Sequence, residues 1–107
     1  IQQSDCDAVD SVGTRCTNLN QPVFTEQLII GNPSAGSSRF GTPPTTSGSV
    51  TATDQANNAA AQATNFSSVM TLSAGVVAYM AEMNNQTPDL NVPGFSGAPL
   101  VYARAIF

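Results

Sequence analysis

Charged side chains are scarce in this sequence. Its 107 residues include three basic and seven acidic side chains, 9% of the chain, whereas a soluble domain usually has about a quarter. Lysine, histidine and tryptophan are absent. The longest stretch without a charged side chain runs over 27 residues, from Gln55 to Ala81. We therefore expect a protein whose surface is decorated or covered by neighbouring molecules, or a protein that works outside the cell.

These absences exclude several kinds of activity. Without histidine or lysine the chain lacks the commonest general base and has no side-chain amine for a Schiff base. Nothing in the sequence selects a pair of carboxylates, so we predict no catalytic residues, no cofactor and no enzymatic activity. The net charge is −4, and the three cations, Arg15, Arg39 and Arg104, are far apart in sequence. Nucleic-acid binding requires clustered basic residues and is not expected.

Two groups of residues could suggest a metal site. The carboxylates of Asp5, Asp7 and Asp10 lie close in sequence, but Val9 stands where a calcium loop would continue its ligands. The thioethers of Met70, Met80 and Met83 could suit copper. A solvated acidic terminus and methionines that fill a core explain both groups more simply. We predict no bound metal.

The two cysteines, Cys6 and Cys16, are separated by nine residues that include Gly13. A lone pair with this spacing and no histidine makes a poor zinc site, so a disulfide is predicted. Disulfides persist mainly in oxidising compartments. Together with the lack of lysine, and with a first residue, Ile1, that resembles a processed N-terminus, this predicts an extracellular or cell-surface protein.

The order of segments predicts one α+β domain over residues 1–107. Residues 23–30 and 100–107 are eight-residue runs rich in strand-forming side chains, and we expect them to pair as a small antiparallel sheet. Residues 31–50 are Gly, Pro, Ser or Thr at fifteen of twenty positions, which indicates a long loop. Residues 86–99 form a second turn-rich connection.

Between these loops, the spacing predicts one long helix of low charge over residues 54–84, packed on the sheet. Thr53 or Asp54 could cap it, and its apolar positions recur on one broad stripe. A competing pattern is open. Residues 69–80 also alternate between apolar and more polar positions, as a strand does, which would give an all-β sandwich.

The uncharged stretch is not expected to enter a membrane. A span needs about 20 apolar residues, and the first half of this stretch is rich in amides and hydroxyls. Two acceptor triplets for N-glycosylation begin at Asn65 and Asn85, and they bear on function only if the protein passes through a eukaryotic secretory pathway.

These observations predict a non-enzymatic structural subunit of an extracellular assembly, such as a surface filament, fibre or particle shell. The partner would be further copies of the same chain, and the residues expected to pack in the assembly are Phe66, Met70, Val77, Met80, Tyr102 and Phe107. The alternative is a secreted monomeric binding or adhesion module. Its contacts would come from Arg39 and Phe40 in the first loop and Phe95 in the second.

Overall fold

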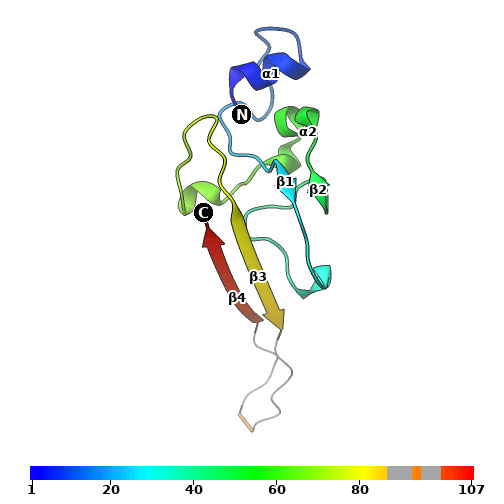
Figure 1. Ribbon diagram of the computed structural model, residues 1–107, viewed down its shortest axis with the longest axis vertical. Coiled ribbons are helices and arrows are strands. Elements are labelled where there is room, and N and C mark those ends of the chain that lie inside the picture. Colours follow the sequence, from blue (N-terminus) through cyan, green and yellow to red (C-terminus); the bar gives the residue numbers. More distant parts are fainter. Residues whose placement is uncertain (87–92, 95–99) are drawn as a thin grey trace. The chain divides into compact units, whose positions relative to one another are not determined.

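Short helices and two small antiparallel sheets make up the structure, a computed structural model that describes residues 1–86, 93–94 and 100–107. In chain order the elements are α1 (Gln3–Val9), β1 (Glu26–Gln27), η1 (Pro33–Ala35), β2 (Gly48–Ser49), α2 (Ala52–Asn57), η2 (Ala59–Ala61), η3 (Phe66–Ser68), β3 (Met80–Gln86) and β4 (Leu100–Ile106), where η denotes a 3-10 helix (Figure 1). The α+β prediction is confirmed at this level.

The predicted long helix over 54–84 is wrong. The cap is Thr51 and not the predicted Thr53 or Asp54, since the Thr51 hydroxyl accepts from the Asp54 amide at 3.1 Å, and α2 ends at Asn57. Asn58 then takes an extended conformation, and its side chain accepts from the Ala60 amide at 3.0 Å to start η2. Short polar side chains that bond the nearby backbone compete with helix formation, and this segment is rich in them. Asn58 is therefore both the C-cap of α2 and the N-cap of η2.

The predicted strand pairing is also wrong. Strand β1 is only the middle of the predicted 23–30 strand, and it pairs with β2, Glu26 opposite Ser49. Strand β4 pairs instead with β3, Met80 opposite Ile106. Closing a loop becomes costlier as it lengthens, and β3 is the much nearer partner of β4 in sequence. The all-β alternative fails as well, because Met80 is the only residue of 69–80 that lies in a strand.

The predicted loops keep little regular structure. Residues 31–50 contain only η1 and β2. Most of the predicted 86–99 loop lies outside the described residues; Gln86 ends β3, and residues 93–94 form a turn.

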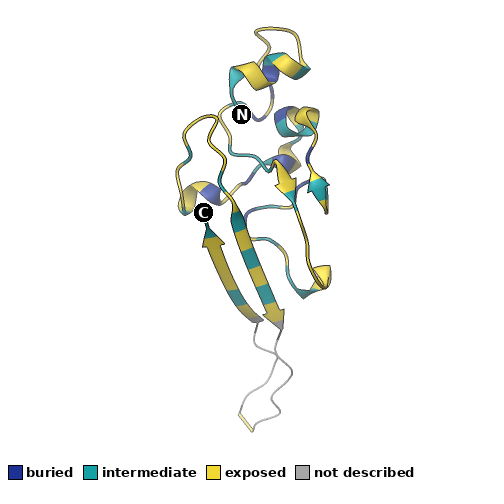
Figure 2. Ribbon diagram, in the orientation of Figure 1, coloured by how far each residue is buried: buried dark blue, intermediate teal, exposed yellow. Residues whose placement is uncertain are grey.

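The chain divides into two compact units. We call Ile1–Ile30 with Ser38–Val77 the N-terminal unit, and Gly31–Ser37 with Ala78–Phe107 the hairpin unit. In the part of the chain that the structure describes, every fully buried residue belongs to the N-terminal unit, which carries all the dark blue ribbon in Figure 2. The expectation of one domain over 1–107 stays a prediction.

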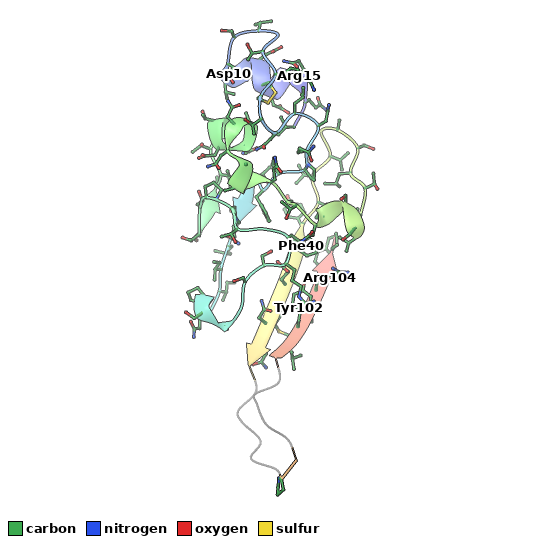
Figure 3. The ribbon with its side chains drawn as sticks, turned by 180° about the vertical axis from the view of Figure 1, so that it is seen from behind. Asp10, Arg15, Phe40, Tyr102 and Arg104 are labelled. Carbon is green, nitrogen blue, oxygen red and sulfur yellow. A yellow bond between two sulfur atoms is a disulfide. The ribbon has the colours of Figure 1, made fainter. Side chains whose placement is uncertain are left out.

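The predicted disulfide between Cys6 and Cys16 is confirmed, with the two Cα atoms 5.4 Å apart (Figure 3). It links α1 to the following loop, and both cysteines are buried against Ala56 of α2. Apolar side chains that pack around this cluster are Ile1, Val9 and Leu19. A crosslink over so short a loop stabilises a fold by about 2–3 kcal/mol in the chain-entropy account. The disulfide thus supports a core that alanine alone would fill thinly.

Asn18 is a polar side chain at the centre of the N-terminal unit, and it is completely buried. Its amide nitrogen donates to the carbonyl oxygens of Gln55 and Asn58 at 2.9 and 2.8 Å. Its oxygen accepts from the Gln62 side chain at 2.8 Å, and its backbone amide donates to Ala56 at 2.9 Å. The Asn18 side chain therefore links the segment that follows Cys16 to α2 and to the residues that flank η2.

A second part of the core lies around two phenylalanines. The rings of Phe40 and Phe66 meet edge to face, with their centroids 6.1 Å apart. Both side chains are buried, as are Ala61 and Ala63. Phe40 brings the long loop onto the body of the unit, where the carbonyl of Arg39 accepts from the side chain of Asn65 at 2.9 Å.

Candidate functional site

The carboxylates near the N-terminus accept hydrogen bonds that support the fold of the N-terminal unit. Asp5 accepts from the Gln2 amide at 2.7 Å and so closes the first turn of α1. Asp7 accepts from the Gln3 side chain and from the Gly13 amide, both at 2.8 Å. Asp10 accepts from the Asn57 side chain at 2.7 Å. Among the described residues, no group of three or more His, Cys, Asp or Glu is placed to hold a metal ion.

Two of the acidic groups have shifted pKa values. Hydrogen bonds from Gln3 and then from the Gly13 amide lower the pKa of Asp7 below its ordinary value of 3.8. Those from Asn58 and then Thr51 lower the pKa of Asp54 in the same way. Hydrogen bonds to the charged form of a carboxyl favour ionisation. Both carboxylates therefore support nearby turns and show no sign of tuning for proton transfer at neutral pH.

The lowered pKa values of Asp7 and Asp54 determine how the stability of the fold should change with pH. A carboxyl whose pKa is lower in the folded state stabilises the fold above its unfolded pKa, and this contribution is lost as the pH falls through the folded value. We expect the urea midpoint to fall as the pH drops below about 4, with the Asp7→Asn and Asp54→Asn variants showing a shallower decline. Equal acid sensitivity in the wild type and both variants would contradict this assignment.

The six residues predicted to pack in an assembly do not share one helix. In the N-terminal unit, Phe66 is buried against Phe40, whereas Met70 and Val77 are exposed. The other three lie in the hairpin unit: Met80 and Tyr102 are half-buried, and Phe107 is exposed. Their role in assembly stays a prediction.

The hairpin of β3 and β4 sorts its side chains onto two faces. Tyr79 and Phe107 exchange both backbone hydrogen bonds, at 3.2 and 2.9 Å, just before β3 begins and just after β4 ends. Side chains two residues apart along a strand share a face. The register of the hairpin therefore puts four cross-strand pairs on one face: Tyr79–Phe107, Ala81–Ala105, Met83–Ala103 and Asn85–Val101.

We call these eight residues the uncharged face, because none of their side chains carries a charge. All eight are exposed, and the alternating colours along β3 show the same division in Figure 2; on β4, Arg104 of the opposite face is exposed as well. The exposed fractions of the four largest are 73% for Tyr79, 58% for Met83, 46% for Val101 and 78% for Phe107. A contiguous group of exposed apolar side chains usually marks an interaction surface.

The opposite face of the hairpin is more polar and better covered. It carries both charged side chains of the two strands, Glu82 and Arg104, which stand opposite each other. The Tyr102 hydroxyl donates to Glu82 at 2.8 Å. Gly36 lies so close to Asn84 that a Cβ atom at residue 36 would be 2.5 Å from that side chain. The chain's own 31–37 segment therefore contacts this face.

The prediction from sequence identified Phe107 but missed the other seven residues of the uncharged face as site residues. A signal was present, because Tyr79, Ala81 and Met83 are uncharged at every second position, while Glu82 lies between them. The helical spacing of the same residues hid it.

Phe40 bears on the alternative of a monomeric binding module. That module would use Phe40 as a contact residue, but the side chain is only 2% exposed. Phe95, its counterpart in the second loop, lies outside the described residues.

The comparisons with known proteins give no relative. No protein-family model matches the chain, and no curated protein or solved structure is similar enough to count as a match. Within the described ranges, none of the helices has both the length and the apolar character that crossing a bilayer requires.

Proposed function

We propose that this protein is a non-enzymatic structural subunit of an extracellular assembly, such as a surface filament, fibre or particle shell, and that it associates with copies of itself. The observation that carries the proposal is the uncharged face of the β3–β4 hairpin. Its eight side chains are exposed, and two of them are aromatic.

The make-up of the hairpin unit supports self-association. Among its described residues, no side chain is fully buried, and β3 and β4 form a sheet of only two strands. A two-stranded hairpin is marginally stable in water unless something packs on it. The 31–37 segment contacts the Asn84 face, so the uncharged face is the one that a neighbour would cover.

The composition supports self-association, and the disulfide supports an extracellular location. A surface with few charges gives a free monomer little protection against association, because like charges keep copies of a protein apart. The Cys6–Cys16 disulfide fits an exported protein.

Sedimentation velocity over a wide range of protein concentration tests this function. We expect species larger than the 11.0 kDa monomer to grow with concentration in buffer without reductant, because burial of apolar surface drives association. Added salt should weaken this association little, since the uncharged face has no ion pairs to screen. A single monomeric species up to about millimolar concentration, where even weak complexes form, would contradict the proposal.

A further inference from the structure

We infer that two copies of this chain pair through the uncharged face, stacked face to face with their β3 strands antiparallel about a two-fold axis. The inference rests on the proposed function and names the contact surface of that assembly. It follows from three properties of the hairpin: where its charges lie, how much apolar area it exposes, and the order of large and small side chains along it.

The charges favour a second copy as the occupant. Burying a charge without a partner is costly. A surface without charged side chains can therefore be buried against an identical surface at no such cost. Both charged side chains of β3 and β4, Glu82 and Arg104, are on the opposite face. Only Asn85 and the Tyr79 hydroxyl are polar on the uncharged face, and both lie at its ends, where they can keep contact with water.

The exposed area reaches the lower limit for a stable dimer when the whole face is covered. An aromatic side chain presents about 150–250 Å², and Tyr79 and Phe107 leave 73% and 78% of theirs exposed. With Met83, Val101, Asn85 and three alanines, the face presents on the order of 600 Å², which reaches the lower end of the roughly 600–1,000 Å² per partner in stable interfaces.

The order of side-chain sizes selects the antiparallel arrangement. Along the hairpin the four cross-strand pairs are two aromatics, two alanines, Met83 with an alanine, and Asn85 with Val101. If each cross-strand pair stacked on the same pair of the second copy, the aromatic side chains would be crowded together and a gap would remain between the alanines. A two-fold axis across the strands instead sets Met83 against Ala81 and Phe107 against Val101 of the second copy. The aromatic pair is then no longer stacked on its own equivalent, and the larger side chain of each of these two contacts lies above a smaller one, as close packing favours. The contact of Ala105 with Ala103 is the one place where two small side chains meet.

This arrangement makes a specific prediction for Ala105, which faces Ala103 of the second copy in the middle of the interface. We expect Ala105→Glu to weaken self-association at least about 30-fold, because a carboxylate buried against an alanine has no partner. Ala52→Glu is the matched control. It makes the same change of charge at an exposed position in the first turn of α2, where a carboxylate is well tolerated.

A mixing experiment tests the register. Ala103→Arg should weaken self-association as Ala105→Glu does. When the two variants are mixed, the new carboxylate of one copy faces the new guanidinium of the other, and we expect affinity to recover at least about tenfold over either variant alone. Mass spectrometry of the complexes distinguishes mixed dimers from self-dimers. Thermal melting of dilute protein shows that each variant still folds.

The outcomes separate the two proposals. If the wild type associates but Ala105→Glu behaves like Ala52→Glu, the uncharged face is not the contact and this inference is overturned, while the proposed function stands. If both variants lose association and the mixture does not recover, the antiparallel arrangement is overturned. If the wild type never associates, the proposed function itself fails.

Discussion

Replacing Asn18 with alanine is expected to lower the free energy of unfolding by about 3–5 kcal/mol, the largest effect of any polar substitution in the N-terminal unit. The change removes three side-chain hydrogen bonds at once, to the carbonyls of Gln55 and Asn58 and from the side chain of Gln62. Each partner left unsatisfied away from water costs roughly 1–3 kcal/mol. Urea unfolding monitored by circular dichroism measures the loss.

Asn57→Ala is the matched control for this prediction. Asn57 accepts from the Thr17 amide and donates to Asp10, but these bonds are exposed. Water can replace them, so we expect a loss below about 1 kcal/mol. Similar losses for the two variants would show that the burial of Asn18 contributes nothing of its own.

Phe66→Ala is expected to lower the free energy of unfolding by about 3–5 kcal/mol, the usual cost of removing a buried aromatic ring. Phe66 is buried and meets Phe40 edge to face at 6.1 Å. Truncation removes the contact and leaves a cavity that the short η3 turn, Phe66–Ser68, can close only in part. Phe66→Leu keeps most of the volume and should cost less.

Phe107→Ala is the matched control for this substitution. Phe107 is 78% exposed on the uncharged face, so its truncation should leave the stability of the dilute monomer nearly unchanged and should weaken self-association instead. The two phenylalanines were expected to act together in assembly. An equal effect of both variants on monomer stability would contradict the separation that the structure draws.

Local chemistry determined how much of the fold the sequence could predict. The disulfide needs only two cysteines and a closable loop, and the predicted pair is the observed one. The predicted cap, Thr53 or Asp54, was also within three residues of the observed one, since Thr51 caps α2. Such features depend on near neighbours in sequence, which one sequence displays fully.

Competing local signals, and features set by distant residues, were not predictable in the same way. The periodicity of 54–84 suited a helix, but caps such as Asn58, and Gly75 with its φ of +77°, divide the segment. Strand β4 was recognised from its own residues, while its partner was not, because pairing depends on register and on what else is nearby. The uncharged face can be recognised only when Met80–Gln86 is known to be a strand.

The hydrogen bonds of Asn18 also bear on how the N-terminal unit folds. They join residues 37 to 44 positions apart, whereas the disulfide joins residues only 10 apart. Helices of seven and six residues are too short to persist alone. The rate of folding should then be governed by closure of the long intervening loop. Early formation of the Cys6–Cys16 disulfide would restrain the backbone just before Asn18. Asn18 would then sample fewer conformations before it forms its hydrogen bonds with Gln55, Asn58 and Gln62.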